Sequence, residues 1–283
     1  MRSDERRRRV RGALAGASVY LVLIAGAVLT LAPFVLSVMT SLKTSRQLAT
    51  EPALAAPQPA TGRNYSALFG AGEGFGHALA VTALVVVVVL IGQLSFSILA
   101  AFAFARLRFP GRDALFWVYL ATLMIPPSVT LVPLYLMMTE AGLRNTFWGL
   151  VLPYLFGSPY AVFLLREYFR GIPQDLVDAA RLDGAGPVRV LLQLVLPLSR
   201  PVIATLAVIT VVTHWNNFIW PLIITSGNTW QVVTVATASL QSQYNGNWTL
   251  VMAATTLAIA PLLIVFLIFQ RQIVRSIAIT GFR

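Results

Sequence analysis

The chain has 283 residues, of which 57% are hydrophobic and only 11% are charged. Soluble domains carry about 25% charged residues, and a soluble fold of this size cannot bury so much apolar surface. The composition therefore excludes an ordinary soluble protein and predicts an all-α membrane protein that crosses the bilayer several times.

The net charge of +11 does not indicate a nucleic-acid-binding surface, because the basic residues stand in short runs between long uncharged stretches. The absence of cysteine excludes disulfides and thiol chemistry. The only lysine, Lys43, follows Leu42. The chain therefore lacks the Gly-Lys-Ser/Thr sequence of a P-loop and cannot hold ATP in that way.

Five charge-free windows are long enough to cross a bilayer, for which a helix needs about 20 apolar residues. They cover residues 12–42, 74–105, 114–139, 145–165 and 201–270. The last window has room for two spans, and its middle, between residues 226 and 247, is polar and rich in turn residues. The sequence therefore predicts six transmembrane helices.

The distribution of basic residues predicts the orientation. Seventeen of them fall in the amino-terminal tail, the 106–112 loop, the 166–200 segment and the carboxy-terminal tail, and four fall in the alternate loops. By the positive-inside rule, both termini are then cytoplasmic. The first apolar run is about twice the length of a signal-peptide core, so we interpret it as a retained helix.

These observations predict a linear organisation of the chain. We expect a cytoplasmic tail over 1–12, a first transmembrane helix over 13–39, an extended periplasmic loop over 40–76, a transmembrane domain of five helices over 77–271 and a cytoplasmic tail over 272–283. No charged residue falls inside a predicted span. Because intramembrane charges usually mark ion or proton paths, their absence argues against ion-coupled transport and against carboxylate catalysis within the membrane.

The 166–200 segment, the longest predicted cytoplasmic loop, contains a short amphipathic helix. Pro173 is suited to its first position, and Asp175 lies in the first turn, where the helix dipole favours an anion. Gly184 is suited to end it. A second helix begins at Pro187 and leads to Pro197.

The faces of this short helix differ in chemistry. Leu176, Ala179 and Ala180 share an apolar face, and Asp175, Asp178 and Arg181 lie on another. The two small alanines favour close approach to a groove of another protein.

The same segment resembles the "EAA" loop of bacterial ABC importer permeases. That family has Glu-Ala-Ala, then Gly, then Ile-x-Leu-Pro, where this chain has 178–180 as Asp-Ala-Ala, Gly184 and 194–197 as Leu-Val-Leu-Pro. Asp178 is one methylene shorter than the usual glutamate. The resemblance implies a coupling helix that docks into a separate ATPase subunit. The residues to which it assigns this coupling are Asp175, Asp178, Ala179, Ala180, Arg181, Asp183, Gly184 and Pro197.

Other stretches are similar to the sugar-importing branch of this family, which includes the second permease subunit of the maltose transporter. They are residues 124–127, 132–135, 179–185, 215–222 and 270–271, and the similarity covers roughly residues 77–275. The resemblance implies a type I ABC importer transmembrane domain with the coupling helix between helices four and five. It also implies a second permease in a heterodimer, two ATPase subunits that bind ATP and Mg, and an extracytoplasmic sugar-binding protein, at a bacterial cytoplasmic membrane.

Trp215, Asn216, Asn217 and Trp220 are candidates for a solute path in the outer half of the fifth helix. Aromatic rings pack on the C–H faces of sugars, and amides bond their hydroxyl groups. The alternative is structural, because interfacial tryptophans and amides that bond between helices are common in membrane proteins.

Pro126, Pro127 and Pro133 predict an interruption of the third helix, either as a packing kink or as a broken helix that lines the path. His77 and His214 lack a partner pattern for metal binding or acid–base chemistry, and we interpret both as structural. Residues 231–235 resemble the periplasmic gate region of the family, and a capping loop is the alternative.

The sequence thus predicts a permease subunit of an ATP-driven importer for a carbohydrate or related polyol, with no catalytic and no metal-binding residues. An ion-coupled secondary transporter is the alternative, and the lack of intramembrane charge disfavours it. A polytopic membrane enzyme is a third class. It needs clustered acidic or histidine residues, and helical spacing already explains the one acidic cluster, Asp175, Asp178 and Asp183.

Overall fold

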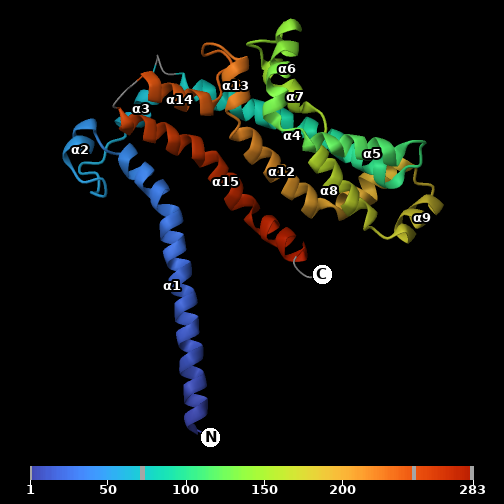
Figure 1. Cartoon of the computed structure of the whole chain (residues 1–283), viewed down its shortest axis with the longest axis horizontal. Helices are drawn as coiled ribbons and strands as arrows, with labels where there is room; N and C mark the ends of the chain where they lie inside the picture. Colours follow the sequence, from blue (N-terminus) through green and yellow to red (C-terminus); the bar gives the residue numbers. More distant parts are fainter. Residues whose placement is uncertain (1, 71–73, 244–246, 281–283) are drawn as a thin grey trace. The chain divides into compact units, whose positions relative to one another are not determined.

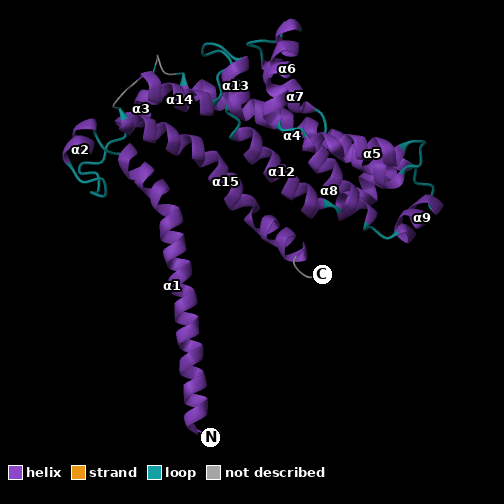
Figure 2. Cartoon of the chain, viewed as in Figure 1, coloured by secondary structure: helices purple, strands orange, loops and turns teal. Residues whose placement is uncertain are grey.

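The computed structural model describes residues 2–70, 74–243 and 247–280, and these ranges contain helices but no strand (Figures 1 and 2). The chain divides into two compact units, Met1–Glu73 with Leu240–Leu257, and Gly74–Ser239 with Ala258–Arg283. The expected boundary near residue 77 lies close to the first of these divisions. Residues 240–257, which the sequence places in the transmembrane domain, group with the amino-terminal unit.

The first unit begins with α1, Arg2–Ser41, which contains the predicted first transmembrane helix. The predicted amino-terminal tail is helical and continuous with it. The loop after this helix is expected to be extended, and in the structure residues 51–62, between two short helices, are free of helix. The two helices are α2, Ser45–Thr50, and α3, Arg63–Leu68. Thr44 and Gln47 form a capping box that begins α2.

Lys43, the only lysine, lies near the start of this loop. Its side chain is fully buried, and its ammonium nitrogen Nζ donates to the carbonyls of Pro52 and Ala53 at 3.2 and 3.4 Å. The Asn64 amide donates to the carbonyls of Ser41 and Lys43 at 2.7 and 2.8 Å. The loop is therefore folded around its polar groups, which satisfy one another.

The second unit contains the remaining helices, two of which it shares with the first unit. They are α4 (Phe75–Arg106), α5 (Arg112–Ala121), η1 (Thr122–Met124), α6 (Pro127–Glu140), α7 (Phe147–Leu155), α8 (Pro159–Arg170), α9 (Gln174–Leu182), α10 (Pro187–Val190), η2 (Leu191–Val195), α11 (Leu196–Leu198), α12 (Arg200–Trp215), α13 (Ile219–Ile224), α14 (Val233–Gln243) and α15 (Trp248–Thr280). The unit boundary falls within α14 and α15.

Four helical segments are long and apolar enough to cross a membrane, namely Gly16–Ser41, Phe75–Arg106, Phe147–Arg170 and Trp248–Gln270. Two helix pairs pass the same test if each counts as one bent span: Arg112–Met124 with Pro127–Glu140, and Pro187–Leu198 with Arg200–Trp215. If each pair is one span, the described residues provide six spans, the number that the sequence predicts. The second pair begins at Pro187, within the 166–200 segment that the sequence predicts as a cytoplasmic loop.

The third span breaks at Pro126, where its halves meet at 100°. Ile125 is extended, with φ −81° and ψ 116°, as is usual for a residue before proline. Pro127 takes the first position of α6, where its missing N–H costs no hydrogen bond. The predicted interruption is confirmed at Pro126 and Pro127, and a bend of 100° is that of a broken span rather than a packing kink. Pro133 does not interrupt the helix, because it lies inside α6.

The predicted fifth helix, from Pro201 onward, has an interruption of its own between Trp215 and Ile219, and the sequence missed this break. Residues 215–222 do not form one helical stretch, because α12 ends at Trp215 and α13 begins at Ile219. Pro221 explains the break, since its ring cannot coexist with a helical carbonyl at Asn217, four residues earlier. The carbonyl of Asn217 accepts instead from the hydroxyl of Thr234 at 2.8 Å.

The loop expected between 226 and 247 is also more ordered than its composition suggests, because it contains α14. The backbone N–H of Val233 at the start of α14 donates to Thr82 Oγ1 in α4 at 2.8 Å. Val232 and Val233 are buried. Residues 231–235 therefore pack into the second unit as a short apolar segment.

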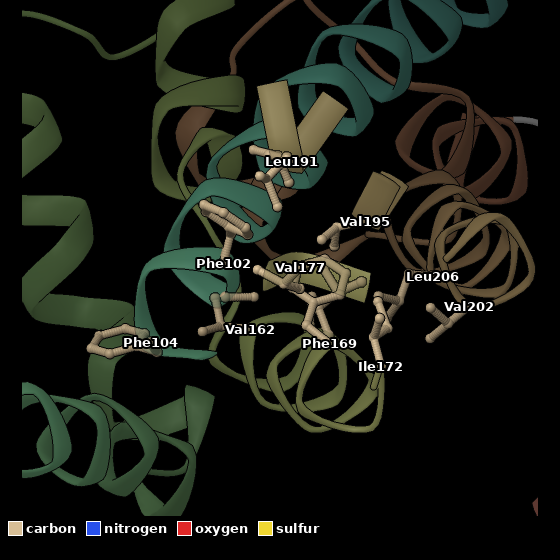
Figure 3. Close-up of a cluster of buried hydrophobic side chains, with 14 of the residues drawn as sticks. Phe102, Phe104, Val162, Phe169, Ile172, Val177, Leu191, Val195, Val202 and Leu206 are labelled. Atoms are coloured by element: carbon tan, nitrogen blue, oxygen red, sulfur yellow. The ribbon is translucent and has the colours of Figure 1, made fainter. Parts of the chain in front are cut away.

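The main core of the second unit lies between α4, α5, α8, α9 and α12 (Figure 3). Phe102, Phe169, Val177 and Val195 gather at its centre, while Phe104 lies apart, packed edge-on against Phe116 of α5 with ring centroids 5.5 Å apart. This core holds the short helix α9 against the ends of two membrane-spanning segments.

Candidate functional site

The predicted coupling helix is α9, Gln174–Leu182. Pro173 is the residue before the helix rather than its first residue, a shift of one position, and Asp175 lies in the first turn as expected. Asp175, Asp178 and Asp183 are all exposed. Among the described side chains, no group of three acidic or histidine residues is placed to hold a metal ion.

The faces of α9 differ in one respect from the prediction. Val177 is the residue that faces the core, with 1% of its surface exposed, whereas Leu176 is 45% and Leu182 90% exposed. Ala180 packs partly against the core, and Ala179 is exposed. The expected apolar face of Leu176, Ala179 and Ala180 is therefore divided, and Val177 is the buried anchor that the sequence analysis missed.

Gly184 ends α9 in a left-handed conformation, with φ +82°. The N–H of Ala185 donates to the carbonyl of Ala180, and the N–H of Gly184 donates to that of Arg181, both at 2.9 Å. This pair of bonds is a Schellman motif, which places glycine at the left-handed position because a side chain there costs free energy. The predicted stop at Gly184 is confirmed.

Arg106, the last residue of α4, clamps the start of α9. Its Nη2 donates to the backbone carbonyls of Phe169 and Ile172, and its Nη1 donates to Gln174 Oε1 at 2.7 Å. Neither Arg106 nor Gln174 is among the site residues predicted from the sequence. A basic residue directly at the end of an apolar window was the available signal, but nothing in the sequence connected it with residues more than 60 positions away.

Asp178 and Arg181 interact within α9. Asp178 Oδ1 accepts from Gln174 Nε2 at 2.9 Å and from Arg181 Nη1 at 3.5 Å. Because Gln174 also bonds to Arg106, the aspartate joins a chain of hydrogen bonds that runs from α4 along one side of α9. This chain fixes the polar side of the helix relative to its anchor.

The segment after α9 is a helix with one π turn. It begins at Pro187 as predicted, and the N–H of Leu196 donates to the carbonyl of Leu191, five residues earlier. The next residue, Pro197, cannot donate to Gln193, and its ring disfavours the usual carbonyl position there. The π turn accommodates this proline, and α11 then meets α12 at the 80° bend.

The two predicted tryptophans of the solute path are buried. Trp220 donates its Nε1–H to the carbonyl of Gly149 at 3.0 Å, and Trp215 donates to that of Ala258 at 2.9 Å. Gly149 lies four residues before Pro153, so its carbonyl has no helical donor. Trp220 therefore supplies the hydrogen bond that Pro153 removes.

The other predicted path residues differ in exposure. Asn216 is exposed, and its amide donates to the carbonyl of Val212 at 2.8 Å, whereas Asn217 is half-buried. Pro126 and Pro127 are exposed at the break of the third span.

The structure adds polar partners that the sequence analysis did not connect. The His214 ring lies 4.8 Å from the Tyr154 ring, and Thr210 donates to Gln93 Oε1 at 3.2 Å. Thr210 and His214 share one side of α12, because they are four positions apart in the helix. His77 lies with its Nε2 2.9 Å from the carbonyl of Thr229, which fits a structural role.

Comparison with known proteins identifies the family. Residues 93–279 match the family described as binding-protein-dependent transport system inner membrane component. The chain is 34% identical over 265 residues to the sn-glycerol-3-phosphate transport system permease protein UgpE of Yersinia pestis (strain Antiqua), covering 91% of this chain and 94% of that protein. It is 34% identical over 269 residues to the protein of the same name from Rhizobium meliloti (strain 1021), covering 92% and 95%.

Solved structures agree on the fold. The chain superimposes with a TM-score of 0.81 and 21% identity on a chain of a bacterial ABC transporter involved in the import of the acidic polysaccharide alginate, covering 91% of this chain and 96% of that one. A second match, with a TM-score of 0.61 and 16% identity, is a bacterial alginate ABC transporter in complex with a periplasmic protein that holds an alginate pentasaccharide; it covers 90% and 95%. These matches confirm the predicted type I importer fold.

The family and the apolar helices together place the chain in the inner membrane as a multi-pass protein. The relatives are transport permeases, so the main prediction from the sequence holds over the secondary transporter and the membrane enzyme. The chain belongs to the family of binding-protein-dependent transport system inner membrane components and is a permease subunit of an ABC importer.

Proposed function

We propose that this permease imports a carbohydrate or related polyol, including polyol phosphates, and that α9 couples it to a separate ATPase. The observation that carries the coupling is the form of α9: a short helix anchored inside by Val177, clamped at its start by Arg106, and exposing Leu176, Ala179 and Leu182. Exposed apolar side chains on a rigidly held helix favour docking into a protein groove.

The partners follow from this proposal. One chain offers one such helix, so two ATPase subunits require a second permease, which makes the membrane part a heterodimer. ATP and Mg bind to the ATPase subunits, and the chain itself holds no cofactor. An extracytoplasmic binding protein delivers the solute and favours one of the two access states by binding it more tightly.

The substrate class is supported by the names of two groups of relatives. Two of the similar permeases are named for sn-glycerol-3-phosphate transport, and a structural neighbour belongs to a transporter that imports the acidic polysaccharide alginate. Both solutes carry several hydroxyl or other oxygen groups that can form hydrogen bonds. The side-chain amides of Asn216 and Asn217 can donate to and accept from these oxygen groups.

Purification from the native membrane in mild detergent tests the whole proposal. We expect a second permease and a P-loop ATPase to accompany the chain, with ATP hydrolysis stimulated by one solute together with its binding protein. A chain that purifies alone and whose uptake activity depends on the proton gradient rather than on ATP would overturn it.

The orientation needs its own experiment, for which the natural lack of cysteine is convenient. We propose that both termini and α9 are cytoplasmic and that the 40–76 loop is periplasmic. Arg189→Cys and Gln58→Cys variants, each carrying the only thiol, should be labelled from opposite sides by a membrane-impermeant maleimide. Labelling of Gln58→Cys only from the cytoplasmic side would reverse the topology.

A further inference from the structure

A cavity of about 640 Å³ lies between the carboxy-terminal end of α4 and the side of α9. Four guanidinium groups line it, from Arg106, Arg108, Arg112 and Arg181, together with Gln174 and Asp178. The lining therefore carries four formal positive charges and one negative charge. A cavity of this size and sign is suited to an anion.

Carboxylates of the residues that the structure describes pair with only two of these four arginines. Arg112 pairs with Asp113 at 3.1 Å, and Arg181 reaches Asp178 only at 3.5 Å. Both terminal nitrogens of Arg106 donate hydrogen bonds to uncharged oxygens, so no carboxylate in the described ranges pairs with it. Its Nε is buried without a hydrogen-bond partner among the described residues. Arg108 is exposed and forms no ion pair within the described part of the chain.

The hydrogen-bonding geometry of guanidinium groups favours a phosphate group as the bound anion. Arginine presents a planar fork of N–H donors that matches two phosphate oxygens at once. Arg106 is also the last residue of a segment that is long and apolar enough to cross a membrane, so the cavity lies at one end of a candidate span. Anionic phospholipid headgroups lie at such ends. We propose that this cavity binds a phosphate group, carried either by an anionic phospholipid or by a free phosphate ion.

The site joins two elements that the proposed transport cycle uses. A phosphate held by Arg108 from the loop after α4 and by Arg181 from α9 bridges these elements, in parallel with the clamp that Arg106 provides. Bound phosphate therefore stabilises the position of α9 against the end of α4. The site goes beyond the proposed coupling function, and its binding can be measured without transport or ATP hydrolysis.

Two variants and one control test the site in the full chain with whatever partners accompany it. Arg108→Gln and Arg181→Gln each remove one lining charge, and Arg189→Gln removes an exposed arginine of the same segment outside the cavity. Arg106 is left intact, because its replacement would also remove the hydrogen bonds to the carbonyls of Phe169 and Ile172 at the end of α8. Binding of radiolabelled inorganic phosphate is measured in phosphatidylcholine nanodiscs, with chloride at equal ionic strength as the reference.

A second measurement identifies the source of the phosphate group. Native mass spectrometry counts the phosphatidylglycerol molecules that stay bound after extraction from mixed nanodiscs, with and without added phosphate. Saturable phosphate binding without retained phosphatidylglycerol indicates the free ion, and retained phosphatidylglycerol indicates the headgroup. In either case we expect about tenfold weaker binding in the two cavity variants and no change in Arg189→Gln.

Two results would overturn the proposal. One is binding of phosphate and phosphatidylglycerol that is equal in the cavity variants and the control. The other is loss of the accompanying ATPase subunit from the cavity variants with ligand binding unchanged, which would make the cavity a docking surface for acidic groups of that subunit.

Discussion

The guanidinium carbon of Arg166 lies 4.0 Å from the centroid of the Phe116 ring, so the end of α8 stacks on α5. Both residues are buried. The same guanidinium pairs with Glu167 at 2.7 Å and with Asp113 at 3.5 Å. Arginine suits this position because its charge is spread over a flat, weakly hydrated group that can stack and donate at the same time.

Replacement of this arginine is expected to loosen the second unit. Arg166→Met removes the cation–π contact and the charged hydrogen bonds, and we expect a loss of about 1–3 kcal/mol in the free energy of unfolding. The unfolding temperature of each variant in detergent measures this loss of stability. Arg170→Met is the control, because Arg170 is exposed and pairs with the same Glu167 at 3.4 Å. Equal unfolding temperatures for both variants would show that the stacking contributes nothing.

The left-handed glycine gives a test of the coupling loop. A Cβ at Gly184 meets no atom within 4 Å, so Gly184→Val acts through its φ of +82° alone. We expect a cost of about 1–2 kcal/mol, an altered end of α9 and abolished transport with normal membrane levels. Gly184→Asn should retain more uptake, because asparagine tolerates this conformation.

Gly186 provides the matched control for that variant. Its Cβ also meets nothing within 4 Å, but its φ of −70° suits any residue. Gly186→Val should therefore transport normally. Unimpaired uptake by Gly184→Val would contradict the assignment of this loop to coupling.

The two sides of α9 should respond differently to truncation. Val177→Ala removes two methyl groups from the core, and we expect a loss of about 2 kcal/mol in stability. Leu176→Ala changes an exposed side chain, and we expect unchanged thermal stability but weaker association with the ATPase. Unfolding temperature and the amount of ATPase that purifies with each variant separate the two roles. Full ATPase association in Leu176→Ala would show that this face does not dock.

The buried tryptophan of α13 should prove structural. Trp220→Phe leaves the carbonyl of Gly149 without a donor, at an expected cost of about 1–3 kcal/mol. We expect a lower unfolding temperature with the KM for solute unchanged. Asn216→Ala should show the opposite behaviour, with normal stability and an altered KM. A raised KM in Trp220→Phe at normal stability would return this residue to the solute path.

Much of this fold could be predicted because the membrane restricts the choice to helices, and charge-free windows show where they cross. The stop at Gly184 and the break at Pro126 were also accessible, since each depends on the conformational preference of one residue. The break at Asn217 follows from the same proline rule. The aromatic and apolar character of residues 215–222 concealed it.

Long-range partnerships could not be predicted. Arg106 and Gln174 are 68 positions apart, and their contact depends on how α4 and α8 pack. Val177 and Leu176 are both apolar neighbours in the sequence, and a difference of one position on the helix decided which of them faces the core. The sequence shows which faces of a short helix are apolar. Which of these faces is buried depends on the tertiary packing of the helix.

Because Lys43 is buried, chemical modification of its side chain can be used to measure unfolding of the loop that contains it. Its amine is the only one that a lysine side chain contributes, and no part of it reaches solvent in the folded loop. Acylating reagents should leave Lys43 unmodified in the native protein and modify it once the loop between α1 and α4 opens. The rate of acylation at this one site therefore measures the local stability of that loop, without any engineered label.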